Sequence, residues 1–220
     1  PPKGQLRPSQ SIFSPKAARI TRMFLAAPRS ARTQREIAAR TGLSKGLISR
    51  IVNKMEDAGY VTKKAQKFAL SNFDDLLSAW VESEAKRREV KKNYYVWAQN
   101  PEKLMKLVAG KMSGRNIKYA FTQEAGASLA APFASFNMVT LYVDSLEEFP
   151  AKDLSATPAD KGFNLTVIEA PDDFVFANAR EKEGLKFVDN FQLYADLKKN
   201  PLRGEKQAAR ILALIKKEKR

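Results

Sequence analysis

The sequence contains no cysteine and no histidine among its 220 residues. Without cysteine there are no disulfides and no thiolate chemistry, and the reducing cytoplasm is the expected location. Without histidine the chain lacks the commonest general base, the Ser–His and Cys–His nucleophile pairs, and the usual nitrogen ligand of zinc. We therefore expect no cofactor and no metal, and a protein that acts by binding rather than as an enzyme.

Long apolar runs are missing as well. No stretch approaches the roughly 20 apolar residues that a helix needs to cross a bilayer, so we expect no membrane partner. The hydrophobic fraction is nevertheless 44%, which is enough for a packed core. The length allows one large domain or two small ones.

Acidic residues are scarce in the first third of the chain. Residues 1–70 hold fifteen Lys and Arg against Glu36, Glu56 and Asp57, a net charge of +12 out of the total of +15. The remaining residues therefore share a net charge of only +3. Such segregation is typical of a nucleic-acid-binding half joined to a nearly neutral half. A generally basic protein without a nucleic-acid partner is the alternative interpretation.

Three helices and a hairpin are predicted in the basic third. Proline at the first helical position predicts a helix over 15–27. A T-x-x-E capping box and a closing glycine predict a second helix over 34–42. A serine cap begins a third helix over 45–59, and a lysine-rich tip between β-branched and aromatic residues predicts a hairpin over 60–70. This order is that of a winged helix-turn-helix.

The segment "TQREIAARTGLSKGLISRIVNKMEDAGYVTKK" resembles the MarR-like group of bacterial and archaeal regulators. It shares their second helix of small residues, the "GLS" turn, a third helix that ends "MEDAGYV", and a basic wing. The resemblance implies a DNA-binding winged helix. A winged helix that contacts another protein is the alternative.

The third predicted helix has two contrasting faces. Apolar residues at helical spacing, such as Ile48 and Met55, form a face to be buried. In a winged helix the N-terminal part of this helix enters the major groove. The residues expected to face base edges and phosphates are Ser44, Lys45, Gly46, Ser49, Arg50, Asn53 and Lys54. Arg50 is the expected guanine contact, because a guanidinium bridges O6 and N7; an ordinary solvated arginine is the alternative.

A second group of residues is expected to hold the DNA backbone. Thr33 and Gln34 lie at the start of the second helix, and Lys63, Lys64 and Lys67 lie on the wing. Phosphate contacts of this kind fix position and carry no sequence information. The expected partner is double-stranded DNA, an operator with inverted repeats.

The rest of the chain mixes helix and strand patterns. The strand patterns lie at 118–121, 138–144, 163–170 and 174–179, and helices are predicted over 100–112, over 122–133 and on both sides of Pro201. The aromatic run 93–98 is predicted to be a buried strand, with base stacking as the alternative. The expected fold class is α+β. The domains are predicted as a flexible basic arm (1–13), the winged helix (14–71), a connecting helix (72–92) and a compact α+β domain (93–220).

We find no catalytic motif in this second domain. The stretch "VAGKMSGRN" lacks the spacing that holds a phosphate at a helix N-terminus. Asp144 follows a predicted strand without a second acid two residues away, and Asp172–Asp173 is typical of a turn.

Three segments resemble the AbiEi-type family of antitoxins and regulators: "NFDDLLSAWVE", "YAFTQEAGASLAAPFASFNMVTLYVD" and "DNFQLYADLKKNPLRGEKQAARIL". The resemblance implies a winged helix before an α+β domain, in a cytoplasmic repressor of its own operon. It also implies an antitoxin of a type IV toxin–antitoxin pair, which neutralises a nucleotidyltransferase-like toxin without necessarily binding it.

Two other functions remain open. A winged-helix regulator unrelated to a toxin could sense a small ligand in an apolar pocket, which leaves no sequence motif. A nucleotidyl-transferring enzyme is the other alternative, and the lack of paired carboxylates argues against it.

Overall fold

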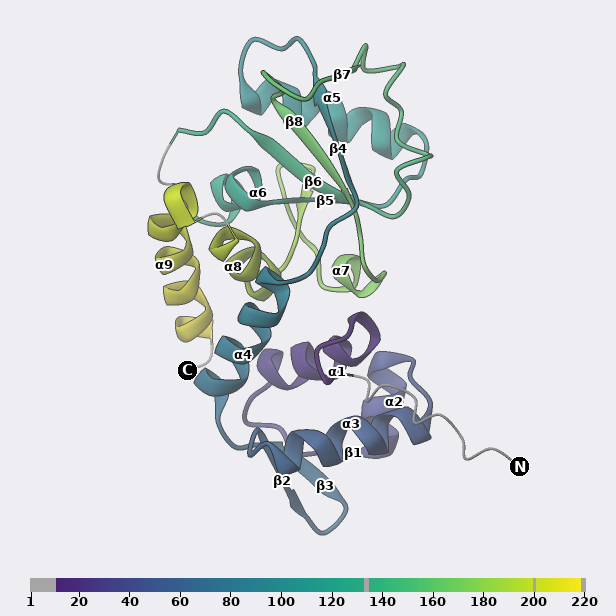
Figure 1. The fold of residues 1–220 in the computed structure, drawn as a ribbon, viewed down its shortest axis with the longest axis vertical. Coiled ribbons are helices and arrows are strands. Elements are labelled where there is room, and N and C mark those ends of the chain that lie inside the picture. Colours follow the sequence, from purple (N-terminus) through teal and green to yellow (C-terminus); the bar gives the residue numbers. More distant parts are fainter. Residues whose placement is uncertain (1–10, 133–134, 200, 219–220) are drawn as a thin grey trace, which may run out of the picture. The chain divides into compact units, whose positions relative to one another are not determined.

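The computed structural model describes residues 11–132, 135–199 and 201–218 (Figure 1). Most of the expected basic arm, residues 1–10, lies outside the described residues. The chain divides between Ser83 and Glu84 into two compact units. The fold is α+β, as the sequence predicts, with a winged helix-turn-helix followed by a unit built on a larger sheet.

The first unit follows the predicted order of elements. They are α1 (Pro15–Ala26), β1 (Arg32–Thr33), α2 (Gln34–Thr41), α3 (Lys45–Asp57), β2 (Val61–Lys64) and β3 (Lys67–Leu70), followed by α4 (Phe73–Ala85), which crosses the boundary. The strands form an antiparallel sheet in the order β1-β3-β2. Strands β2 and β3 form the wing hairpin (Figure 1).

The helix boundaries arise from the predicted local signals. Pro15 occupies the first position of α1, and the Thr33 side chain accepts a hydrogen bond from the Glu36 amide at the start of α2. Gly42 ends α2 with a φ of +68°, in the left-handed region that favours glycine. The Ser44 side chain then caps α3 by accepting from the Leu47 amide.

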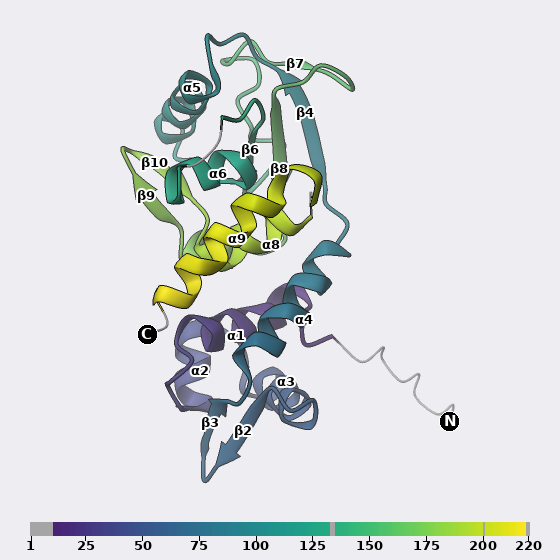
Figure 2. The same cartoon turned by 90° about the vertical axis from the view of Figure 1, so that its left-hand side faces the viewer.

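The second unit contains a mixed seven-stranded sheet. Its elements are β4 (Lys91–Tyr95), α5 (Pro101–Gly114), β5 (Tyr119–Thr122), α6 (Gln123–Ala130), β6 (Val139–Val143), β7 (Thr157–Pro158), β8 (Leu165–Glu169), α7 (Phe174–Ala177), β9 (Arg180–Lys182), β10 (Leu185–Phe187), α8 (Asn190–Lys198) and α9 (Pro201–Glu218). The strand order is β7-β4-β8-β6-β5-β10-β9. Helix α5 packs its apolar side on one face of the sheet, and Ala125 and Leu129 of α6 join the same core. Helix α8 contacts α6 and β5, and α9 packs against α8 (Figure 2).

The structure has a helix where the sequence predicts a strand over 174–179. This short apolar run is typical of a strand, but its first four residues form the helix α7. The Asp172 side chain accepts a hydrogen bond from the Phe174 amide and so starts a helical turn. The last strands instead form the short hairpin β9–β10, which turns at Glu183 and Gly184, both with positive φ. Strand β9 consists of charged residues and has no apolar alternation, so the sequence pattern does not predict this edge strand.

The aromatic run 93–98 is a second correction. A strand is present, but it spans Lys91–Tyr95 and is not buried as a whole. Tyr94 faces the core at 5% exposure, whereas Tyr95 and Trp97 are 47% and 74% exposed. Side chains alternate between the faces of a strand, so a continuous apolar run does not establish burial on both. The expected connecting helix over 72–92 also ends early, at Ala85, because this strand starts at Lys91.

A buried carboxylate organises the second unit. The side chain of Asp196 in α8 is 1% exposed and accepts hydrogen bonds from the Thr122 and Tyr142 hydroxyls at 2.6 and 3.0 Å. It also accepts from the side-chain Nε2 of Gln192 and pairs with the Lys199 ammonium, each at 3.1 Å. Burial and the adjacent Asp196 raise the pKa of Tyr142, which keeps its hydroxyl protonated as a donor. The carboxylate thus joins α8 to strands β5 and β6.

The α8–α9 contact depends on a glycine. A Cβ at Gly204 would lie 2.2 Å from the carbonyl oxygen of Leu197, far inside van der Waals contact. Glycine at this position therefore allows α9 to approach the end of α8. Together with Asp196, it gives the segment "QLYADLKKNPLRGE" a structural explanation.

We expect Asp196→Ala to destabilise the protein by about 3–5 kcal/mol, because it leaves three buried donors and Lys199 without their shared acceptor. Urea unfolding followed by far-ultraviolet circular dichroism measures this loss. Asp160→Ala is the matched control, since Asp160 is exposed in a loop of the same unit and should change stability by less than about 0.5 kcal/mol. Equal stabilities for the two variants would contradict the role assigned to Asp196.

Candidate nucleic-acid interface

Helix α3 has one buried and one exposed side. Ile48, Ile51, Val52 and Met55 are at most 1% exposed. The opposite side carries the residues predicted to face DNA. Ser44, Lys45, Gly46, Arg50 and Asn53 are exposed, and Ser49 and Lys54 are half-buried. Because the apolar side is fixed in the core, the polar side of α3 must point outward.

Arg50 points outward from α3 and has no hydrogen bond or ion pair with the described residues. An arginine held by the fold would need a partner acid, and Glu36 is the only acid in the two preceding helices. The Glu36 carboxylate is instead engaged by Thr33, whose backbone amide and hydroxyl donate to it at 2.7 and 2.9 Å. These two hydrogen bonds lower the pKa of Glu36. Arg50 is therefore available to an external acceptor.

The residues at the start of α2 have a structural task as well. Thr33 is the N-cap, and its hydroxyl both accepts from the Glu36 amide and donates to the Glu36 carboxylate. A phosphate would have to use another donor here, such as the half-buried Gln34. The pairing of Thr33 with Lys67 across β1 and β3 brings a wing lysine beside this helix start.

Lys63, Lys64 and Lys67 are all exposed on the wing hairpin. The Lys63 ammonium lies 5.7 Å from the centre of the Phe68 ring, a cation–π distance. Ala65 at the turn has a φ of 52°, so the hairpin reverses in a left-handed conformation. The wing thus presents its lysines on a short two-stranded support.

Two charged residues near this surface were not predicted. Arg32 in β1 is 8% exposed, and burial together with the neighbouring Arg40 lowers its pKa. Glu56 near the end of α3 accepts a hydrogen bond from the Lys63 backbone amide at 3.2 Å. Glu56 and Lys63 are seven positions apart and lie in different elements, so the periodicity of a single helix or strand could not reveal this bond. Glu56 connects α3 to the wing.

The described residues contain no group of three Asp, Glu, His or Cys side chains that could hold a metal ion. Asp144 directly follows β6, and one of its carboxylate oxygens is buried without a hydrogen bond. Within the described part of the chain, no helix is long and apolar enough to cross a membrane.

Residues 14–67 match a family model described as the MarR family. The match covers the first helix, the helix-turn-helix and most of the wing, and leaves the second unit unmatched. No curated protein and no solved structure matches the chain. Regulators of the MarR family bind double-stranded DNA, so the match and the exposed basic side of α3 together indicate a DNA-binding transcriptional regulator.

Arg50→Ala tests the outward side of α3. It should weaken binding to a selected duplex by about 1–3 kcal/mol and relax the preference at one base pair. The melting temperature should hardly change, since exposed substitutions stay within about 0.5 kcal/mol. Paired binding and melting measurements check both statements. A lower melting temperature with intact sequence preference would assign Arg50 to the fold, and base recognition would pass to Lys45 and Ser49.

Glu56 variants test the link between α3 and the wing. Glu56→Gln removes the negative charge but keeps an acceptor for the Lys63 amide, whereas Glu56→Ala removes both. A hydrogen bond of this kind contributes about 0.5–1.5 kcal/mol, so the alanine variant should bind DNA roughly 2- to 10-fold more weakly than the glutamine variant. Its Lys63 amide should also exchange faster with solvent.

Asp57→Asn is the control for charge, because it removes an adjacent exposed acid that holds no wing amide. It should bind DNA like Glu56→Gln. If Glu56→Ala matches both of these variants in affinity and in amide exchange, then the wing does not depend on this hydrogen bond.

Proposed function

We propose that the chain is a sequence-specific, DNA-binding repressor. One observation carries the proposal: α3 buries its apolar side completely and presents a basic, polar side whose central arginine, Arg50, has no partner within the described residues. In a winged helix this side lies against the major groove. The proposed partner is a double-stranded operator with inverted repeats, which would present the same sequence to two copies of the helix.

We propose further that this repressor is the autoregulating antitoxin of a type IV toxin–antitoxin pair in the cytoplasm. The support is the resemblance of the second unit to AbiEi-type proteins. Two residues of the resembling segment have a role in the fold: Asp196 joins α8 to β5 and β6, and Gly204 allows α9 to approach α8. These roles support a shared fold rather than a toxin contact. The proposed functional partner is a nucleotidyltransferase-like toxin, and the chain itself is proposed to have no enzymatic activity.

Co-expression with a nucleotidyltransferase-like gene from the same operon tests the antitoxin role. Growth should recover when the chain is present and fail when it is absent. Arg50→Ala should derepress the operon, so the toxin should be supplied from an independent promoter to separate neutralisation from repression. Continued toxicity in the presence of the folded wild-type chain would refute the antitoxin role, and the proposed repressor function would stand alone.

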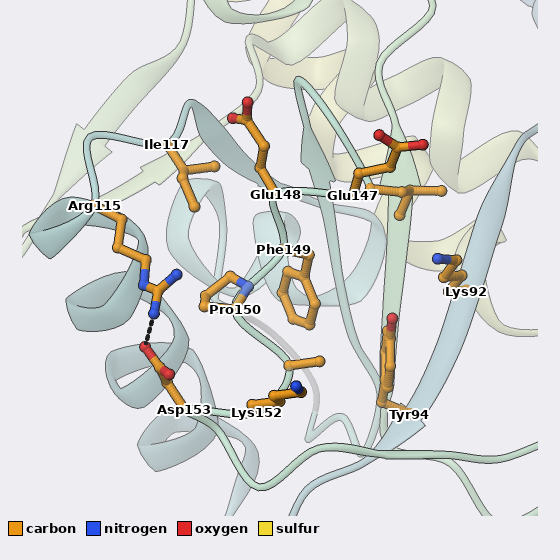
Figure 3. A pocket seen from close by; sticks show the side chains of 12 residues that line it. Lys92, Tyr94, Arg115, Ile117, Glu147, Glu148, Phe149, Pro150, Lys152 and Asp153 are labelled. Carbon is orange, nitrogen blue, oxygen red and sulfur yellow. Dashed lines mark ion pairs between the residues drawn. The ribbon is translucent and has the colours of Figure 1, made fainter.

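A ligand-responsive regulator is the second candidate, and a pocket in the second unit favours it (Figure 3). The pocket has a volume of about 800 Å³, and Lys92, Tyr94, Phe149, Arg115 and Asp153 are among its lining residues. The Tyr94 hydroxyl points into it and has no hydrogen-bond partner among the described residues. Arg115 and Asp153 form an ion pair at 2.6 Å on the opposite side. A change in DNA affinity on addition of a metabolite would favour this regulator.

The salt dependence of DNA binding tests the proposed repressor. If several of the basic residues in 1–70 neutralise phosphates, the affinity should fall on a log–log plot with a slope of roughly −4 to −8, about −0.9 per contact. Lys63→Ala and Lys64→Ala should weaken selected and random duplexes equally and make the slope shallower. A slope near zero for the wild-type chain would refute DNA binding.

A further inference from the structure

Gly46 is the second residue of the helix that we propose reads DNA. It is exposed, its φ lies outside the left-handed region, and it continues a regular helical turn from Lys45. Glycine in the middle of a helix destabilises a protein by roughly 0.5–1 kcal/mol relative to alanine, and in the first turn, where Gly46 lies, it still loses more conformational freedom on folding than any other residue. Gly46 therefore weakens the fold unless something else requires the missing side chain.

Nothing within the described part of the protein requires it. A Cβ at position 46 would meet no atom within 4 Å, whereas one at Gly204 would overlap the backbone of Leu197, and Gly42 needs its positive φ. Packing thus explains Gly204, and backbone conformation explains Gly42. Neither explains Gly46.

The place of Gly46 on α3 points outside the molecule. Residues three and four apart share a helix face, so Gly46 lies one turn before Ser49 and Arg50 on the exposed side. The preceding residue Lys45 is also exposed. Gly46 is consequently a gap in the polar surface, at the end of α3 that is proposed to enter the groove.

We propose that Gly46 is a clearance position, where the backbone of the first turn of α3 comes into close contact with DNA. The absence of a side chain lets this turn approach the groove wall closely enough for Arg50 to reach a base edge. Gly46 is thus a positioning residue for the base contact, and this inference rests on the proposed DNA-binding function. Glycine serves other proteins in the same way where a backbone must approach a ligand.

Gly46→Ala and Gly46→Leu test this role, with Gly110→Ala as the matched control. Gly110 is also an exposed glycine inside a helix, α5, where a Cβ would meet nothing within 4 Å. The probes are a 30-base-pair duplex that the wild-type chain has selected from a random pool, and a scrambled duplex of the same composition. Both alanine variants should raise the melting temperature, because alanine favours the helix.

Only the substitutions at Gly46 should weaken DNA binding. Gly46→Ala should reduce affinity for the selected duplex at least 5-fold, and Gly46→Leu should reduce it further, since the larger side chain holds α3 farther from the groove. Gly110→Ala should bind like the wild-type chain. The loss should be greater on the selected than on the scrambled duplex, because it removes a base contact.

Several outcomes would overturn the inference. Gly46→Ala binding within 2-fold of wild type would show that α3 has room for a side chain. Equal losses for alanine and leucine would indicate that flexibility of the first turn, rather than clearance, matters. If the wild-type chain selects no duplex from the random pool at low salt, the proposed DNA-binding function fails and this inference fails with it. If the wild-type chain binds the selected duplex and Gly46→Leu binds it equally well, only the clearance role is refuted.

Discussion

The burial of one side of α3 is the constraint on which the candidate interface depends. Ile48, Ile51, Val52 and Met55 are almost completely removed from solvent, and each contributes roughly 1.5–3 kcal/mol by its burial. The register of this apolar side fixes the rotation of the helix about its axis. A rotation that exposed Arg50 differently would have to expose these side chains, so the core determines which residues are available to a partner.

The second unit depends on a different kind of interaction. Asp196 is held by four donors from α8, β5, β6 and the residue after α8. Burial alone would lower the pKa of Lys199, but the neighbouring carboxylates of Asp196 and Glu89 raise it by more. The net shift is upward, so the ammonium stays charged. Loss of Asp196 would leave the Thr122 and Tyr142 hydroxyls and the Gln192 side-chain amide buried without this acceptor, while Lys199 would keep its ion pair with Glu89. The segment that contains Asp196 is thus explained by its role in the fold rather than by a catalytic role.

The sequence predicted the first unit well and the second less well. Capping residues and helical periodicity are local signals, and they determined α1, α2, α3 and the wing. Segment 174–179 and the hairpin β9–β10 were not predicted correctly, since short apolar runs do not distinguish a helical turn from a strand and charged edge strands carry no apolar pattern. The outward placement of Arg50 followed from periodicity. The bond from Lys63 to Glu56 joins two elements and is visible only in three dimensions.

The exposure of Trp97 has a practical consequence. The chain has two tryptophans; Trp80 in α4 is 1% exposed and lies in the first unit, whereas Trp97 in the second unit is 74% exposed. A buried indole emits at shorter wavelengths than a hydrated one, and a collisional quencher reaches only the hydrated one. The fluorescence spectrum therefore contains one separate signal for each unit, and the unfolding of the winged helix can be followed through the shorter-wavelength emission without an added label.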